Sequence, residues 1–207
     1  MVKMTRLSAI ILTILTLFAC TNNESKKQLT KLEQYVNSAD SSTRKSNLFD
    51  QIATKILTEK KEIKPSELKL YNNDTTGKLS EQTFHFPHDT VGQHSDLTNN
   101  IRIIEYQSDR HAANAFLDIV EFEACCIPDE DIVRLKNFEN LDNFKNTAST
   151  TLLSENLVIE VYLGNNIKDN QQVLNLLDSI LIDKKYLKLE IGNTGPAIWT
   201  RKQNHRL

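Results

Sequence analysis

Two adjacent cysteines, Cys125 and Cys126, are the residues of this 207-residue chain whose type and spacing best suit redox or metal chemistry. The remaining cysteine of the sequence is Cys20, near the N-terminus. Neighbouring α-carbons lie about 3.8 Å apart, below the roughly 4.4–6.8 Å of ordinary disulfides, so a vicinal bridge would be strained and easily reduced. Three interpretations stay open: a vicinal disulfide or thiol pair, a metal or redox centre, and two small side chains packed at a helix end. We expect the third.

Histidines form the next candidate group. His85, His88 and His94 follow the spacing H-x2-H-x5-H, and His111 comes later in the chain. That spacing is not a zinc-binding pattern, and no cysteine or paired carboxylate stands beside it at ligand spacing. Because His85 alternates with two phenylalanines, we expect it on the solvent side of a strand. The pattern predicts surface imidazoles, with no bound metal and no cofactor.

Acidic residues gather around the cysteine pair, and paired carboxylates can exchange protons or bind a hard cation. The members are Glu121, Glu123, Asp129, Glu130 and Asp131. This run lacks the alternating ligands and the central glycine of an EF-hand. The chain also has no G-x-S-x-G, H-E-x-x-H, P-loop or G-x-G-x-x-G motif. We therefore interpret the acidic cluster as a solvated helix end and loop, and the sequence disfavours an enzyme.

Apolar residues at helical spacing predict the helices that would carry these groups. Ser108 can cap a helix whose apolar positions line one face up to the cysteine pair. Pro65 ends the N-terminal helical pattern. The predicted helices cover about 29–36, 48–57, 109–124 and 173–181.

β-Branched and aromatic runs predict the strands. These cover about 101–106, 147–153, 157–163 and 186–191, and 197–199 would extend the last of them. The polar spacer 154–156 is short, which predicts a hairpin. Residues 71–100 and the connection after Pro128 predict loops, with one short strand near Phe84. The combined patterns predict a core that includes Phe116, Ile119, Val161, Leu174, Leu177 and Ile180.

From residue 101 onward the predicted order is β-α-β-β-α-β, which indicates an α+β domain. The layout resembles a ferredoxin-like sandwich, with helices on one face of an antiparallel sheet, and also the larger PsbP-like sandwiches. This resemblance is one of layout and implies no function. We expect an N-terminal helical segment at 29–70 that joins an α+β part at 71–207 in one domain.

The N-terminus has the layout of an export signal. Lys3 and Arg6 precede an apolar run of about thirteen residues, whereas roughly twenty are needed to span a bilayer as a helix. The run ends at Leu17-Phe18-Ala19-Cys20, which resembles the lipobox of bacterial lipoproteins. The resemblance implies that residues 1–19 are removed as a signal peptide, that Cys20 is lipidated, and that 20–28 form a tether to the membrane.

The charge of the mature chain bears on its partners. Removal of 1–19 takes Lys3 and Arg6 from the 25 basic residues and nothing from the 27 acidic ones, which leaves a net charge of about −4. Nucleic acid is therefore not an expected partner. In lipoproteins an aspartate after the lipidated cysteine favours the inner membrane, and this chain has Thr21 there. The resemblance implies the outer membrane, facing the periplasm.

These patterns together predict a lipid-anchored protein of the bacterial cell envelope. Without a catalytic motif, a protein-binding or assembly module is the leading hypothesis, with a protein partner in the envelope. Two alternatives stay open: an inhibitor or immunity-type lipoprotein, and an envelope metal or redox factor that uses Cys125 and Cys126.

The first prediction concerns the anchor. The wild-type protein is expected to carry an acyl group on Cys20 and to partition with membranes, because lipidation requires the thiol of that residue. The variant Cys20→Ala should lack the acyl group, as mass spectrometry of the purified chain would show. Recovery of unacylated wild-type protein in the soluble periplasmic fraction would refute the anchor.

Overall fold

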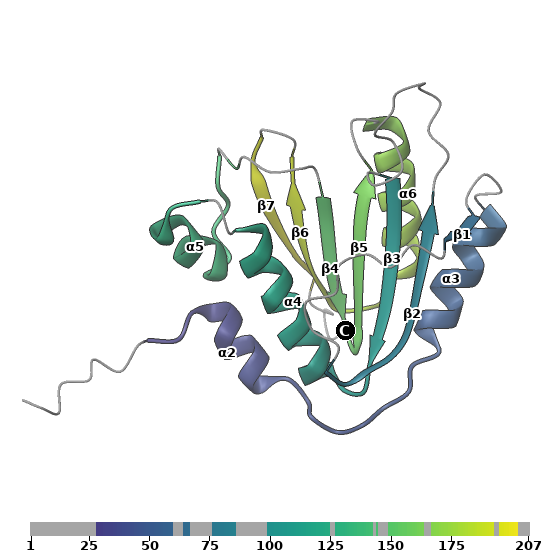
Figure 1. Cartoon of the computed structure of the whole chain (residues 1–207), viewed down its shortest axis with the longest axis horizontal. Helices are drawn as coiled ribbons and strands as arrows, with labels where there is room; N and C mark the ends of the chain where they lie inside the picture. Colours follow the sequence, from purple (N-terminus) through teal and green to yellow (C-terminus); the bar gives the residue numbers. More distant parts are fainter. Residues whose placement is uncertain are drawn as a thin grey trace, which may run out of the picture.

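Seven strands form one antiparallel sheet in the order β1-β2-β3-β5-β4-β6-β7 (Figure 1). The computed structural model describes residues 28–59, 64–66, 76–85, 99–124, 127–142, 144, 149–163, 167–192 and 195–202. The strands are β1 (Lys64–Ser66), β2 (Lys78–His85), β3 (Asn99–Tyr106), β4 (Ser149–Ser154), β5 (Leu157–Leu163), β6 (Tyr186–Ile191) and β7 (Ala197–Lys202). The helices within the described residues are α2 (Lys31–Ser38), α3 (Leu48–Glu59), α4 (Asp109–Glu123), α5 (Asp129–Lys136) and α6 (Ile167–Ile180). The predicted α+β class and antiparallel sheet are confirmed.

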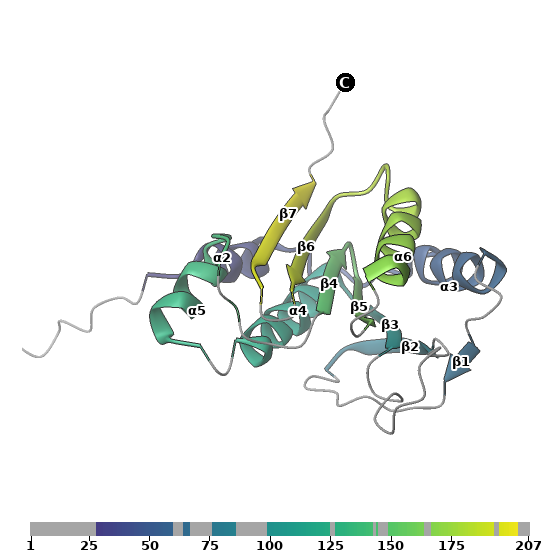
Figure 2. The same cartoon turned by 90° about the horizontal axis from the view of Figure 1, so that it is seen from above.

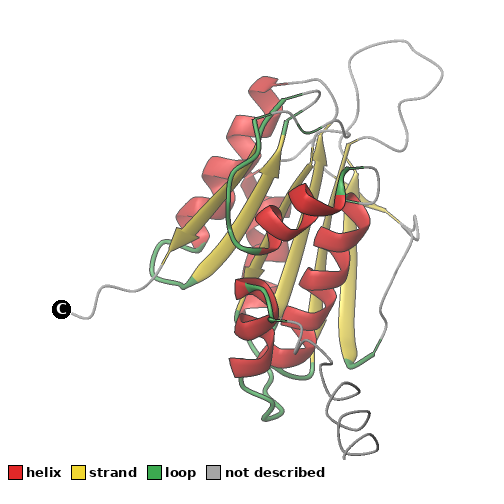
Figure 3. Ribbon diagram, turned by 90° about the vertical axis from the view of Figure 1, so that its left-hand side faces the viewer, coloured by secondary structure: helices red, strands yellow, loops and turns green. Residues whose placement is uncertain are grey.

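Helices cover both faces of the sheet, so the protein has three layers (Figures 2 and 3). Alternate residues of a strand point to opposite faces. On β3, Ile104 and Tyr106 pack in one core with α2, α4 and α5, on what we call the α4 face. Ile101 and Ile103 pack in a second core with α3 and α6, on the α6 face. The central strands are thus buried on both sides.

The expected ferredoxin-like layout, with helices on one face, is wrong. That layout needs β6 beside β3, but β2 pairs with β3 on that side, and β6 pairs with β4 instead. The crossovers β3–α4–β4 and β5–α6–β6 therefore move across the sheet in the same direction. They start from antiparallel strands. Right-handed crossovers of this kind must place their helices on opposite faces.

The N-terminal helices belong to different layers. Leu32 of α2 packs in the core of the α4 face, and Ile52 of α3 packs in the core of the α6 face. The link between the two helices passes beneath the lower end of the sheet (Figure 1). There the Arg44 N–H donates to the carbonyl of Gln107 at 2.9 Å, and the Ser46 N–H donates to the Glu105 carboxylate at 3.0 Å. The link is therefore hydrogen-bonded to the sheet along its path.

Local signals placed several elements correctly. The Ser108 hydroxyl accepts from the N–H of His111 at 3.3 Å and caps α4, as predicted. Strands β4 and β5 form the predicted hairpin, with Glu155 and Asn156 between them. Pro65, which the helical pattern could not contain, lies in the edge strand β1, where a missing N–H is tolerated.

Two expectations about the connections are wrong, and a third is confirmed only in part. The short strand expected near Phe84 is the longer β2, residues 78–85, because pairing with β3 supplies order that the polar sequence did not signal. The connection after Pro128 contains α5, whose eight residues are too few for a clear period. Residues 197–202 do not extend β6 but turn back to pair with it as β7, through a turn in which the Gly192 N–H donates to the Pro196 carbonyl.

The predicted core is mostly right. Phe116, Ile119, Val161 and Leu177 are buried. Leu174 and Ile180 are only half-buried, which corrects the expectation for them. They flank the stripe of α6 that faces the sheet, whose centre is Val173 and Leu177.

The second prediction tests this core. Phe116→Ala should lower the free energy of unfolding by about 3–5 kcal/mol, because the ring is fully buried and its removal leaves a cavity. Phe122→Ala on the same helix is the matched control, since that ring is 58% exposed and its loss should change stability by less than about 0.5 kcal/mol. Chemical denaturation of both variants checks the pair. Equal midpoints for Phe116→Ala and wild type would contradict the core.

Candidate binding groove and buried ionic network

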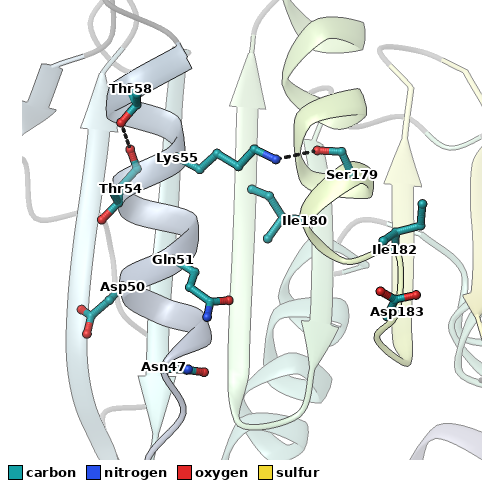
Figure 4. Close-up of a pocket in the computed structure, with 10 residues that line it drawn as sticks. All are labelled: Asn47, Asp50, Gln51, Thr54, Lys55, Thr58, Ser179, Ile180, Ile182 and Asp183. Carbon is teal, nitrogen blue, oxygen red and sulfur yellow. Dashed lines mark hydrogen bonds between the residues drawn. The ribbon is translucent and has the colours of Figure 1, made fainter.

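An open groove of about 810 Å³ lies between α3 and the C-terminal end of α6 (Figure 4). Ligand sites in proteins commonly occupy about 300–1,000 Å³. One wall comes from α3 and the residue before it, and the other comes from the end of α6 and the turn that follows. The lining residues are Asn47, Asp50, Gln51, Thr54, Lys55, Thr58, Ser179, Ile180, Ile182 and Asp183.

The groove follows from how the two helices use their apolar stripes. Ile52 and Ile56 of α3 and Leu177 of α6 are fully buried against the sheet. The polar positions between these residues must then lie along the sides of each helix. Because both helices pack on the α6 face and touch each other, their polar sides border a shared groove.

Most of the residues that line the groove carry hydrogen-bonding groups, and Ile180 and Ile182 are the apolar ones. The Lys55 ammonium donates to the Ser179 hydroxyl oxygen across the groove at 3.4 Å, as Figure 4 shows. Ser179 donates its own proton to the carbonyl of Leu176 at 2.7 Å. Lys55 therefore acts as a donor and not as a base toward this serine. Ile182 is 61% exposed. The arrangement suits binding better than nucleophilic catalysis.

A chain of charges crosses the opposite, α4 face of the sheet, buried at its centre and more accessible toward β2. Arg102 and Glu160 are paired directly across β3 and β5 and are both buried. The Arg102 guanidinium donates to Glu160 at 2.9 Å and to Glu81 on β2 at 2.6 Å. Glu81 also accepts from Lys78 at 2.6 Å. Two cations thus match two carboxylates along three neighbouring strands.

Tyr162 extends this chain to α4. Its hydroxyl donates toward Glu123 at 3.2 Å and toward Glu160 at 3.3 Å, and its single proton serves one of them at a time. Burial raises the pKa of Tyr162, so the phenol keeps its proton. We call Lys78, Glu81, Arg102, Glu160, Tyr162 and Glu123 the ionic network.

Burial disfavours the charge of both inner carboxyls of the ionic network: the pKa of Glu160 is raised despite Arg102, and that of Glu123 is raised as well. Burial raises the pKa of Glu123 to about 6, the hydrogen bond from Tyr162 opposes this, and repulsion from Glu160 adds to it. Burial alone would lower the pKa of Arg102, but the carboxylates of Glu160 and Glu81 outweigh this effect and raise the pKa above its usual value. Arg102 therefore stays charged, while Glu123 exchanges its proton in mildly acidic solution. With only 7% of Glu123 exposed, this carboxyl is poorly placed to meet a substrate.

The structure divides the acidic cluster that the sequence suggested. Glu123 is buried in the ionic network, so its interpretation as a solvated residue is wrong. Glu121 joins Glu33 in binding the ammonium of Lys136, at 2.6 Å and 2.7 Å. Asp129 to Asp131 form the first turn of α5, where negative charge stabilises a helix N-terminus. The cluster is therefore not a single site.

The remaining candidates can be placed only in part. Cys20, Cys125 and Cys126 lie outside the described residues, as do His88, His94 and the side chain of His85. The His111 ring lies 2.8 Å from the Ser108 hydroxyl and packs against Gly77, where an added Cβ would stand 2.5 Å from the ring. Within the described residues, no group of three or more histidine, cysteine or acidic side chains could hold a metal ion.

Sequence reasoning missed both the groove and the ionic network. Opposite charges within two otherwise apolar runs, Arg102 in one and Glu160 in the other, were the available signal for a buried cross-strand pair. No such signal existed for the groove, because it depends on the packing of two helices more than a hundred residues apart in the chain.

No protein family matches the chain, and no curated protein or solved structure matches it. Among the described helices, none is both long and apolar enough to cross a membrane.

The third prediction concerns the pH dependence of stability. The pKa of Glu123 is about 6 in the folded protein and about 4.5 in the unfolded chain, so the folded state holds the proton more tightly. The free energy of unfolding should therefore fall as pH rises from about 4.5 to about 6 and stay lower above that range. The contribution is about 2 kcal/mol.

Glu123→Gln should remove the contribution of Glu123 to this dependence, because an amide stays neutral and can still hydrogen-bond Tyr162. The variant is expected to match wild type near pH 4.5 and to exceed it by about 2 kcal/mol at pH 7.5. Urea denaturation across this pH range provides the measurement, with the exposed Glu130→Gln as the matched control. A stability difference between Glu123→Gln and wild type that does not change with pH would contradict the assignment.

Proposed function

We propose that the mature protein is a lipid-anchored, non-enzymatic protein-binding module of the bacterial cell envelope, with the groove between α3 and α6 as its binding surface. The observation that supports a binding site is the groove itself, which is open, has a volume of about 810 Å³ and exposes Ile182 at one wall. The lipobox-like sequence at Cys20 supports a lipid anchor, and Thr21 supports localisation at the outer membrane, facing the periplasm.

The composition of the groove indicates the kind of partner. Amide, hydroxyl and carboxylate side chains along both walls can pair with the backbone groups of a protein segment laid between the helices. Ile182 offers a site for one apolar side chain of that segment. Complete burial of an isoleucine contributes about 1.5–3 kcal/mol, and Ile182 still has most of its surface to bury.

The chemistry of the described side chains favours binding over catalysis. In the groove the serine donates to a backbone carbonyl and the lysine is a donor. In the ionic network the carboxyls whose pKa is raised, Glu123 on α4 and Glu160 on β5, are both buried. Because the sheet has helices on both faces, we also infer that its layout is nearer to the larger PsbP-like sandwiches than to the ferredoxin-like one.

The fourth prediction is that groove variants lose the partner. Ile182→Asp should weaken capture at least tenfold in a crosslinking pull-down from intact envelopes, because it places a charge where an apolar contact is expected; tenfold corresponds to about 1.4 kcal/mol. Gln51→Arg, which fills the groove from the α3 wall, should have a similar effect.

Leu79→Asp is the matched control, because Leu79 is an exposed apolar residue on β2 outside the groove lining. It should capture the partner like wild type. If Ile182→Asp, Gln51→Arg and Leu79→Asp, each acylated and folded, all captured the partner equally well, the groove would not be the binding surface. A captured hydrolase or toxin would identify the protein as an inhibitor.

A further inference from the structure

Three large apolar side chains are exposed at the end of the molecule formed by α2, α5 and the C-terminus of α4. Leu29 is 46% exposed, Phe122 58% and Val133 50%. Phe122 lies on α4, Val133 lies on α5, and Leu29 lies just before the N-cap of α2. We call these three residues the end patch.

Lys136 holds the elements of the end patch together. Its ammonium is bonded to Glu33 of α2 and Glu121 of α4, and it lies on α5 itself. Phe122 follows Glu121 directly, and Val133 precedes Lys136 by one helical turn. Leu29 stands four residues before Glu33, and the Lys31 N–H donates to Asn137 at the end of α5 at 3.0 Å. Each member of the patch is thus within one turn of a residue that this contact fixes.

The end patch is also the part of the fold nearest to the anchor. Leu29 is nine positions after Cys20, with eight residues between them, and nine fully extended residue steps span about 30 Å. A lipid on Cys20 therefore confines Leu29 to within about 30 Å of the bilayer. α2 and α5 lie at one end of the molecule and α3 at the other in both views (Figures 1 and 2). The anchored end and the groove end are consequently opposite.

We propose that the end patch rests on the lipid surface that holds Cys20, with Leu29, Phe122 and Val133 at the boundary between headgroups and acyl chains. This inference rests on the proposed lipidation. Tethering makes the contact effectively intramolecular, so a small apolar patch suffices to orient the domain. The acidic first turn of α5 would be repelled by anionic lipid, so the surface is a zwitterionic one. The groove then faces away from the membrane, open to a partner.

Depth-dependent quenching of tryptophan tests this orientation on the whole mature protein. Trp199 is the one tryptophan of the chain and its indole nitrogen is buried, so a second tryptophan reports on its own position. The test positions are Phe122→Trp and Val133→Trp in the end patch. Ile182→Trp in the groove and Leu79→Trp on β2 are the matched controls, since all four residues are exposed.

Each variant is reconstituted in phosphatidylethanolamine–phosphatidylcholine vesicles whose acyl chains carry bromine, after mass spectrometry has established acylation. The fluorescence of the introduced tryptophan at position 122 or 133 is expected to fall at least twofold in the brominated vesicles, while that of a tryptophan at position 182 or 79 stays unchanged. Acylated protein with equal quenching at all four positions, or with quenching at 182, would overturn the orientation and leave the anchor intact.

Crosslinking between end patches of two copies, without quenching, would likewise overturn the proposal in favour of a dimer. Stronger quenching when phosphatidylglycerol replaces part of the lipid would overturn the zwitterionic surface. Absence of the acyl group would instead refute the proposed function, and the orientation with it.

Discussion

The two crossover connections, β3–α4–β4 and β5–α6–β6, start from antiparallel neighbouring strands and cross the sheet in the same direction. Because both connections are right-handed, α4 and α6 lie on opposite faces of the sheet. The other positions in the fold depend on this constraint. It buries β3, β4 and β5 on both sides, as Ile103 and Ile104 illustrate, because each face receives its own core. It also separates the two surfaces with functional proposals. The groove can form only where α3 meets α6, and the end patch only where α2 and α5 meet α4.

Burial of the central strands makes the charges on them costly, and the ionic network shows how this cost is offset. Arg102 and Glu160 face each other across β3 and β5, and Glu81 and Lys78 continue the alternation of charge toward β2. A buried pair compensates its desolvation only when geometry and further hydrogen bonds satisfy both partners. Glu123 enters the same region from α4 without a cation of its own in the network, so burial raises its pKa and repulsion from Glu160 adds to the effect, while the carboxylates around Arg102 keep it charged. The network links the sheet to α4 but gives it little access to solvent.

The position of α5, and with it part of the end patch, depends on a strained residue. Phe138 follows the helix with φ of 62°, a conformation that costs a bulky residue roughly 1–2 kcal/mol. It closes a Schellman motif, in which the Glu139 N–H donates to Arg134 and the Phe138 N–H donates to Leu135. The ring is held edge-on to Trp199 of β7, 5.0 Å away, and the Arg201 guanidinium lies 5.4 Å above it. Packing on the sheet thus compensates a local strain at the end of a short helix.

The sequence by itself determined the local elements, because helical and strand periods and caps act over a few residues: the Ser108 cap, the β4–β5 hairpin and the apolar stripe around Phe116 and Leu177 were all predictable. The proposed export signal and lipobox are likewise inferred from the sequence alone, since such signals are linear. Only the tertiary structure decided the strand order, the faces that α4 and α6 cover, the full length of β2, and the existence of α5 and β7 as separate elements. It also decided that Glu123 is buried while Glu121 binds Lys136, and that α3 and α6 border a groove. The physical reason is that these features come from pairing and packing between distant residues, whose free energies no local window of sequence contains.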